Sequence, residues 1–464
     1  MRLLAAHLLV TICVFAAGPA PSTLPPKAQD ALRVFDQWVQ AKAADREQPG
    51  LSIGIVRDQE LIFAKGYGYA DLNNRMPATP QTLYRVASIT KLFTATAAMQ
   101  LRDAGKLRLD DPVAKHLDWF QLHSTKGDVP IQIWHLMTHL SGMPRESAMP
   151  YWNTKTFPTR EQMRAMLATQ DAAYAPATKW KYSNLAVSIE GEIIAKLGGM
   201  EWSDYITARV LKPLGMSASL PLPRANSFGL ASGYGARVAG QARETEEFTD
   251  CKGIAPAASL ATNVEDLARF VSFQFKGDPR VLKLSTLEEM RRPHWVQPSW
   301  ASGWGLGFSL RKLGARTLAG HGGSLGGYRT SVAFDAETKI GVIVLTNSND
   351  GNPELYVDKA FQMVAPTLAP EREKFPAKPE WDKYKGTYRW KTSELIIDVI
   401  DGELIGYSPD AEDPLDARVR MEPVGEHRFR MLTGTSLGEL AVFEVDAAGR
   451  VTKVTAGGYY FLRQ

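Results

Sequence analysis

Two residues three positions apart, Ser88 and Lys91, have the types and the spacing of a nucleophile and its base. On a helix, side chains three residues apart share a face, so the Lys91 amine can lie beside the Ser88 hydroxyl. An alcohol attacks well only when a base takes its proton, and a desolvated lysine can be that base. Residues 82–87 have a strand-like pattern and residues 91–101 a strongly helical one. The pattern predicts a nucleophile at a helix N-terminus, where the dipole and unpaired N–H groups begin an oxyanion site.

A second Ser-x-x-Lys, at Ser309 and Lys312, shows that the spacing alone is not specific. That pair lies in a stretch with an extended pattern, where residues three apart point to opposite faces of a strand. For Ser88 the simpler alternative is a helix N-cap with a surface lysine one turn later.

A second candidate motif consists of Tyr182 and Asn184, between a Pro-rich loop at residues 175–181 and a helical pattern at residues 187–197. A phenol above the serine can shuttle its proton, and an amide can orient the lysine and a substrate carbonyl. The alternative is a buried tyrosine next to an asparagine in a turn.

A third candidate motif is His321-Gly322-Gly323-Ser324. Paired glycines let a backbone approach a substrate without obstruction by a Cβ atom. They suit an edge strand whose amides face a bound acyl group.

Two competing interpretations are weaker. Residues 322–326 fit the Gly-x-Ser-x-Gly elbow of α/β-hydrolases, but that elbow needs a helix after the serine, and residues 328–334 have a strand pattern. His135 and His139, four apart, could ligate a metal on one helix face, but the sequence offers no third ligand beside them. Packing and hydrogen bonding are the preferred roles for both histidines.

The order of the three motifs resembles that of the serine β-lactamase and penicillin-binding-protein superfamily, in particular the class C β-lactamases with their esterase and D-amino-acid peptidase relatives. Further segments carry the same resemblance: Pro49–Val56, Leu136–Gly142, Pro213–Met216, Ser259–Phe270 and Gly303–Phe308.

The resemblance implies a role for each motif residue. Ser88 would be the acylated nucleophile, Lys91 its activating amine and Tyr182 the general base and acid. The substrate-binding or orienting residues would be Asn184, His321, Gly323 and Ser324. Backbone N–H groups of Ser88 and Ser324 would form the oxyanion hole.

The chain departs from the family pattern at two points. His321 stands where many members have a lysine, and a histidine that titrates near 6.5 offers little positive charge at neutral pH. No equivalent is evident for the glutamate that class A enzymes use in deacylation, so Tyr182 must serve that step too.

Composition limits the other function classes. The 464 residues are 44% hydrophobic and 22% charged, as in globular proteins, and the net charge of +4 gives no case for nucleic-acid binding. Residues 1–20 combine a basic start, an apolar run and small residues, which predicts a cleaved secretory signal and a secreted or periplasmic location. No later stretch predicts a membrane span. Beyond that signal Cys251 is the sole cysteine, which excludes an internal disulfide in the remaining chain.

The patterning predicts an α+β fold. Strand patterns near residues 50–87 and 296–348 flank a mostly helical stretch at 88–290, which indicates an antiparallel sheet flanked by helices, with a helical lobe. The predicted domains are a signal peptide at 1–20, a β-lactamase-like catalytic domain at 30–365, a linker at 366–379 and a small all-β, barrel-like domain at 380–464.

We expect a secreted serine hydrolase that cleaves an ester or amide bond through an acyl-enzyme. A D-amino-acid peptidase or carboxypeptidase, a β-lactamase acting on cell-wall-like peptides, and a catalytically silent binding homologue are the alternatives. The expected partner is a small-molecule or peptide substrate, with no cofactor and no metal. The sequence does not indicate an oligomeric state.

Overall fold

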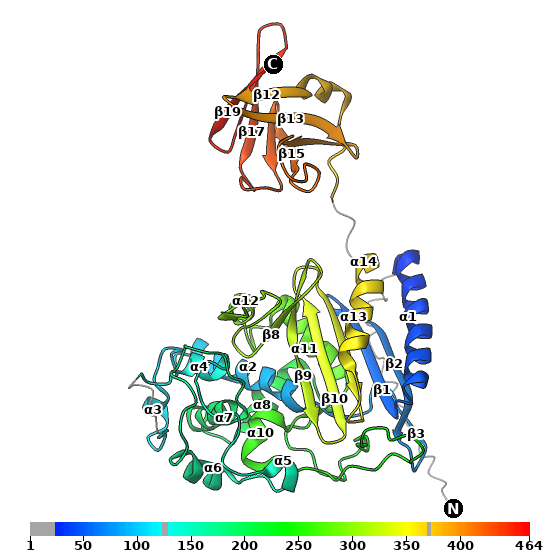
Figure 1. The fold of residues 1–464 in the computed structure, drawn as a ribbon, viewed down its shortest axis with the longest axis vertical. Coiled ribbons are helices and arrows are strands. Elements are labelled where there is room, and N and C mark those ends of the chain that lie inside the picture. Colours follow the sequence, from blue (N-terminus) through cyan, green and yellow to red (C-terminus); the bar gives the residue numbers. More distant parts are fainter. Residues whose placement is uncertain (1–23, 123–128, 369–372) are drawn as a thin grey trace, which may run out of the picture. The chain divides into compact units, whose positions relative to one another are not determined.

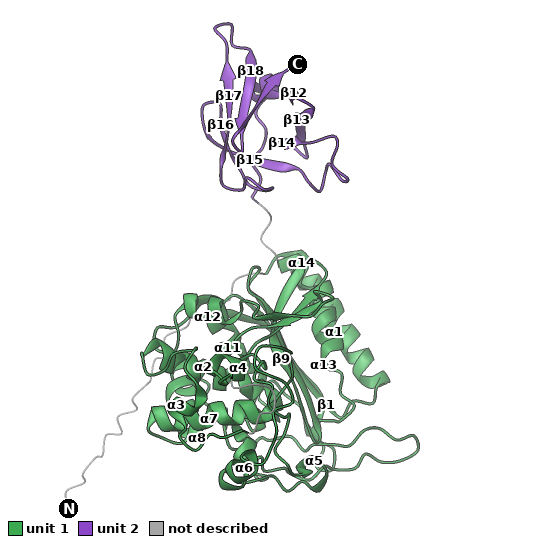
Figure 2. Ribbon diagram, turned by 60° about the vertical axis from the view of Figure 1, so that its left-hand side comes forward, with its two compact units in different colours: residues 1–369 green, residues 370–464 purple. Residues whose placement is uncertain are grey.

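The computed structural model describes residues 24–122, 129–368 and 373–464. The predicted signal peptide at 1–20 lies outside them. The chain divides into two compact units, residues 1–369 and 370–464 (Figure 2).

Unit 1 is built on one antiparallel sheet of nine strands in the order β3-β2-β1-β11-β10-β9-β8-β7-β6 (Figure 1). Its strands are β1 Gly50–Arg57, β2 Glu60–Asp71, β3 Met76–Pro77, β6 Trp295–Val296, β7 Ser302–Trp304, β8 Ser309–Leu313, β9 Arg316–Leu325, β10 Tyr328–Asp335 and β11 Ile340–Thr346. A separate pair joins β4 Tyr84–Arg85 to β5 Ala261–Thr262. Pairing of β1 with β11 brings the two ends of the unit together around the helical insert. The predicted α+β fold class is confirmed.

Helices cover both faces of the sheet, which is why β1 and β11 are nearly continuous apolar runs rather than alternating ones. On one face lie α1 Pro26–Asp45 and α13 Pro353–Met363 (Figure 1). On the other face lies α11 Val264–Lys276 with the helical lobe.

Almost every residue of α2 Thr90–Asp103 is buried within this lobe, where it packs against α7 and α10. The remaining helical segments of the unit are η1 Ala87–Ile89, α3 Val113–His116, α4 Ile133–Met137, α5 Tyr151–Thr154, α6 Arg160–Leu167, α7 Asn184–Gly198, α8 Trp202–Ile206, η2 Thr207–Leu211, α9 Lys212–Leu214, η3 Lys252–Ile254, α10 Ala255–Ala258, α12 Leu284–Met290 and α14 Ala365–Leu368.

Unit 2 is a closed eight-stranded barrel with its own apolar core. After η4 Pro379–Tyr384, its strands are β12 Gly386–Trp390, β13 Ser393–Ile400, β14 Glu403–Tyr407, β15 Val419–Gly425, β16 Arg428–Met431, β17 Leu440–Val445, β18 Val451–Ala456 and β19 Tyr459–Arg463. Within β15, Pro423 and a register shift interrupt the regular strand pairing with β16.

Strands β7 and β8 are separated by a turn that contains Gly307, whose φ is +82°. The structure also corrects one boundary predicted from the sequence. The segment predicted as a linker starts with α14, and its Leu368 is buried in the core between the sheet and α1.

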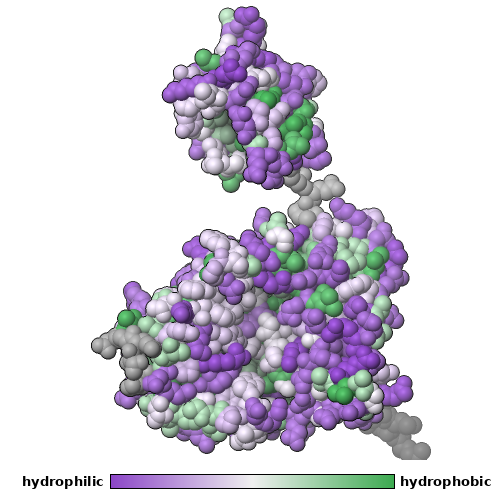
Figure 3. Space-filling view, in the orientation of Figure 1, coloured by the Kyte–Doolittle hydropathy of each residue, from purple (hydrophilic) through white to green (hydrophobic). Residues whose placement is uncertain are grey.

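The surface is mostly polar on the face drawn in Figure 3, where apolar residues form small scattered groups. Within the described ranges, no helix has both the length and the apolar character that crossing a membrane requires.

Candidate active site

Ser88 lies in the middle of η1, and α2 follows directly, so the nucleophile candidate stands at a helix N-terminus as predicted. Ala87, just before it, has the left-handed φ of +48°, which is unfavourable for a residue with a Cβ atom. The turn is held from both sides by Thr90, whose Oγ1 donates to Ala87 O at 2.6 Å and accepts from Leu260 N at 3.0 Å.

The Lys91 amine is buried, with 2% of the residue exposed, and lies 3.1 Å from Ser88 Oγ. It also donates to Asn184 Oδ1 at 2.7 Å and to Ala257 O at 2.9 Å. Burial lowers the pKa of Lys91 from 10.5 to about 7, against the opposing charge of Glu146. About half of the Lys91 amines are therefore neutral near pH 7, and the neutral form can accept a proton.

The tyrosine of the second motif meets the same serine oxygen. Tyr182 Oη donates to Ser88 Oγ at 2.9 Å. Burial raises the pKa of Tyr182, and the hydrogen bond with Ser88 opposes that effect. Tyr182 is therefore a neutral phenol at physiological pH, suited to giving a proton rather than taking one as a phenolate.

Asn184 is the first residue of α7, and Ser183 is the N-cap, whose Oγ accepts from Ala186 N at 2.9 Å. The loop before α5 fixes this helix end: Pro144 O accepts from Ser183 Oγ at 2.6 Å, and Arg145 O accepts from Asn184 N at 2.9 Å. Residues 139–146 thus hold the second motif over the first.

The third motif lies on an open edge. β8 pairs with β9 only as far as Gly320, so residues 321–324 pair with β10 on one side and face the cavity with the other. The strand passes so near η1 that a Cβ atom at Gly323 would lie 2.1 Å from the Val86 carbonyl oxygen. A side chain there would push β9 away from the nucleophile, so glycine is required.

His321 is buried against Trp304, with ring centroids 5.5 Å apart, and its Nδ1 lies 2.5 Å from Gly322 O. Its Nε2 is buried and has no hydrogen-bond partner among the described residues. Burial lowers the pKa of His321 to about 3, helped by the nearby charge of Lys91. The expected titration near 6.5 is therefore wrong, and the ring is neutral throughout the physiological range.

These residues line a cavity of about 830 Å³. The motif residues in its wall are Ser88, Tyr182, Asn184, His321, Gly322, Gly323 and Ser324. Both residues predicted to supply the oxyanion N–H groups, Ser88 and Ser324, are among them, and their role stays a prediction.

Several cavity residues were not found by sequence reasoning: Arg145, Trp152, Trp180, Ala258, Arg329, Gly351, Pro353 and Glu354. They belong to loops and element ends without a motif of their own. Two of them lie near predicted features: Trp180 belongs to the Pro-rich loop at residues 175–181, and Arg145 follows the family-like segment that ends at Gly142.

The remaining histidine prediction concerned packing. His139 is buried, its ring centroid lies 4.3 Å from that of Tyr182, and its Nδ1 accepts from Ser183 N at 3.3 Å. His135 Nδ1 accepts from Gln132 N at 3.0 Å. The two rings thus serve hydrogen bonding and packing, as predicted. Within the described part of the chain, no group of three or more His, Cys, Asp or Glu side chains is arranged to hold a metal.

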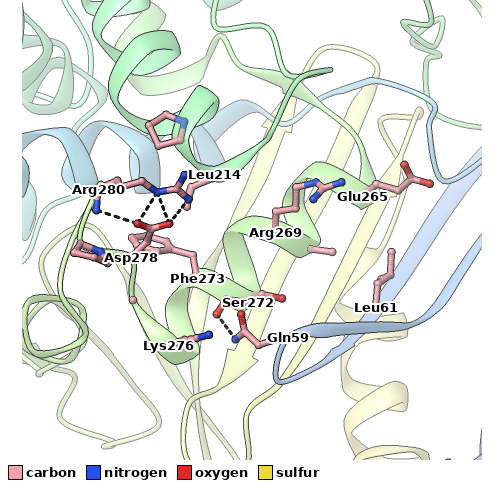
Figure 4. A pocket seen from close by; sticks show the side chains of 14 residues that line it. Gln59, Leu61, Leu214, Glu265, Arg269, Ser272, Phe273, Lys276, Asp278 and Arg280 are labelled. Carbon is pink, nitrogen blue, oxygen red and sulfur yellow. Dashed lines mark hydrogen bonds and ion pairs between the residues drawn. The ribbon is translucent and has the colours of Figure 1, made fainter. Parts of the chain in front are cut away.

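A separate cavity of about 650 Å³ lies between the β1–β2 turn, α9 and α11 (Figure 4). Asp278 and Arg280 form an ion pair in its wall at 2.6 Å, and Gln59 Nε2 donates to Ser272 O at 2.9 Å. None of the three motifs lines it.

Comparison with known proteins agrees with this geometry. The model of the "Beta-lactamase" family matches residues 35–365. "Protein flp" of Staphylococcus aureus (strain N315) is 27% identical over 364 residues, covering 75% of this chain and 71% of that protein. "Beta-lactamase-like protein 2" of Dictyostelium discoideum is 26% identical over 352 residues, covering 74% of this chain and 64% of that protein.

Solved structures share the architecture. The octameric penicillin-binding protein homologue from Pyrococcus abyssi has a TM-score of 0.65 and 26% identity, covering 93% of this chain and 100% of that one. The hydrolase EstCE1, with promiscuous acyltransferase activity, has a TM-score of 0.61 at 22% identity, covering 74% of this chain and 100% of that one, a likeness of fold alone. Because the family model spans most of its length, this chain belongs to the β-lactamase family, within the serine β-lactamase and penicillin-binding-protein superfamily.

Proposed function

We propose that this protein cleaves an ester or amide bond through an acyl-enzyme formed on Ser88. One observation carries the proposal: the Lys91 amine and the Tyr182 phenol converge on Ser88 Oγ, at 3.1 and 2.9 Å, in the wall of a cavity. Nucleophile and base within hydrogen-bond reach, with the base held by further groups, is the arrangement that acyl transfer needs.

Lys91 takes the role of base in the first step. The oxygens of Asn184 and Ala257 are acceptors, and they occupy two N–H bonds of the neutral amine. Its lone pair then faces Ser88 and receives the hydroxyl proton as Ser88 Oγ attacks the substrate carbonyl carbon. The backbone N–H groups of Ser88 and Ser324 stabilise the negative charge that develops on the carbonyl oxygen.

Tyr182 takes the role of proton donor. Its phenol gives a proton to the leaving oxygen or nitrogen, and the proton that Lys91 accepted then replaces it. In deacylation, water attacks the ester carbon, its proton passes to the same pair, and Ser88 leaves with its hydroxyl restored.

The cavity wall supports small neutral esters or amides as substrates, because His321 brings no charge to the β9 edge. A second candidate class carries a carboxylate, as D-amino-acid peptides and β-lactams do. It is favoured by Arg145 and Arg329 in the same wall, the latter bonded within the described residues to the carbonyls of Leu325 and Tyr328. The character of residues 1–20 supports secretion or export to a periplasm.

Intact-protein mass spectrometry with turnover assays tests the proposal. The protein would be incubated separately with a fluorophosphonate, an aryl ester and benzylpenicillin. We expect a stable fluorophosphonate adduct and hydrolysis of the ester. A long-lived penicillin adduct would favour the carboxylate-bearing class, and a protein inert to all three probes would be a binding homologue.

A further inference from the structure

Glu146 extends the hydrogen-bond chain behind the nucleophile. Its Oε1 accepts from Asn184 Nδ2 at 2.7 Å, and its Oε2 accepts from the hydroxyl of Tyr151, a residue that is fully buried. The Glu146 side chain is 16% exposed and also meets Arg145 Nε at 3.2 Å. The carboxylate is thus fixed at both oxygens, and it does not line the substrate cavity.

The chemistry of a carboxylate sets the direction of the neighbouring amide. An ionised carboxylate only accepts hydrogen bonds, whereas the two ends of an asparagine amide differ only in accepting or donating. With Nδ2 held by Glu146, Asn184 Oδ1 must face Lys91, where it accepts at 2.7 Å. A flipped amide would present N–H groups to the Lys91 N–H groups and would turn the amine away from Ser88.

We propose that Glu146 is a positioning residue that fixes the Asn184 amide, and through it directs the Lys91 amine at Ser88. The proposal rests on the proposed function, since it assigns a task within the same acylation. It also identifies an acidic residue next to the motifs that no sequence pattern indicated.

A purely structural role is the alternative, in which Glu146 merely anchors its loop to α7. Main-chain groups already make that connection, because the carbonyls of Pro144 and Arg145 accept from Ser183 and Asn184. A change of the Glu146 side chain leaves those bonds in place, so its effect on the loop and its effect on Lys91 can be separated.

Charge provides the distinguishing signal. The Glu146 carboxylate favours the protonated form of Lys91, while burial disfavours it more strongly. The other charged or titratable groups acting around this amine are Arg145, Tyr182, Cys251, Glu190, His139 and His321. Removing the Glu146 charge alone leaves that set unchanged and moves the protonation of Lys91 to lower pH.

The experiment compares Glu146→Gln, Glu146→Asp and a control, Glu192→Gln, with the parent. Glu192 is a buried acid on α7 that pairs with Arg160 and Arg164 and does not line the cavity. The measurements are kcat and KM for an aryl ester between about pH 5 and 9, the melting temperature and fluorophosphonate labelling.

We expect Glu146→Gln to lower kcat about 10- to 100-fold with KM within about 3-fold, and to move the acid limb of kcat/KM to lower pH. Glu146→Asp keeps the negative charge, so the acid limb of kcat/KM should stay at the parental pH, and kcat should fall less than in Glu146→Gln. Glu192→Gln should lower the melting temperature and leave the rates and the pH profile unchanged.

Two outcomes would overturn the inference alone: an active parent whose kcat and acid limb are unmoved by Glu146→Gln, or equal kinetic losses in Glu192→Gln. If Glu146→Gln does not fold, Glu146→Asp decides the question. An acid limb of kcat/KM at the parental pH together with partial activity in Glu146→Asp would support the proposal. A shifted acid limb, or a complete loss of activity, in Glu146→Asp would count against it. A parent that neither hydrolyses the ester nor takes the label would overturn the proposed function, and with it this inference.

Discussion

Lys91 Nζ donates a hydrogen bond to the backbone oxygen of Ala257 at 2.9 Å, joining α2 to α10 across 166 residues of sequence. Backbone carbonyl and amide oxygens stabilise an N–H group without supplying a negative charge. The amine is therefore held in place by Ala257 and Asn184 while its burial still favours the neutral form.

This placement of Lys91 predicts a specific dependence of stability on pH. The pKa of Lys91 is about 7 in the folded chain and 10.5 for a free lysine, so between these values the unfolded chain binds more protons. The unfolding free energy must therefore rise with pH in that window. Relative to Lys91→Met, the parent should gain on the order of 2–3 kcal/mol between about pH 7.5 and 9.5.

Chemical denaturation of both proteins at the two pH values measures this gain. Groups that do not interact with Lys91 cancel in the difference, whereas Glu190 contributes to it, because burial raises the pKa of Glu190 to about 8 and the Lys91 charge opposes that effect. If the unfolding free energies of the parent and of Lys91→Met respond equally to pH, the Lys91 amine is protonated in the folded chain as it is in the unfolded chain.

Replacement of Tyr182 separates the proton donor from the base. Tyr182→Phe removes the hydroxyl that meets Ser88 Oγ, and loss of a positioned acid typically lowers rates about 100-fold or more. The acid limb of kcat/KM should stay near the pKa of Lys91, about 7, because the base is retained. The test is the rate of aryl-ester hydrolysis by both proteins as a function of pH. If Tyr182→Phe lowers the rate only a few-fold, the tyrosine serves packing and not proton transfer.

His321 should set selectivity without titrating. Because its pKa is about 3, His321 stays neutral between about pH 5.5 and 7.5. The kcat/KM for a neutral ester, divided by the kcat/KM for benzylpenicillin, should therefore stay constant over this range, and the ester should be preferred. His321→Lys adds a positive charge at the β9 edge, and a charged hydrogen bond should move the ratio about tenfold toward the penicillin. A parental ratio that changes with a midpoint near 6.5 would contradict the neutral ring.

The motifs were predictable because their signals are local. Helical spacing alone places Ser88 beside Lys91, and a Pro-rich loop before a helix places Asn184 at a helix start. Paired glycines before another strand pattern indicated the β9 edge, and Gly323 indeed allows close approach to Val86.

The parts that could not be predicted depend on contacts distant in sequence. Glu146 meets Asn184 from 38 residues away, and Ala257 meets Lys91 from 166 residues away. The pKa of His321 depends on burial, which no spacing pattern reports. Strand patterns also do not predict a proline inside a strand, as Pro423 lies inside β15.

Removal of unit 2 should leave a folded and reactive unit 1. Each unit has its own apolar core, and Leu368 belongs to the core of unit 1, so the truncation should end at 369 rather than earlier. Residues 24–369 should melt cooperatively and take a fluorophosphonate label at a rate within a few-fold of the full chain. Insoluble or unreactive protein would show that the barrel completes the fold or the site.

Acylation of Ser88 is decided by locating the fluorophosphonate adduct. Intact mass followed by peptide mapping of the parent, Ser88→Ala and Ser324→Ala should place one adduct on Ser88. Labelling should vanish in Ser88→Ala, with a melting temperature close to that of the parent, and persist in Ser324→Ala. An adduct retained in Ser88→Ala, or lost only in Ser324→Ala, would show that Ser88 is not the nucleophile.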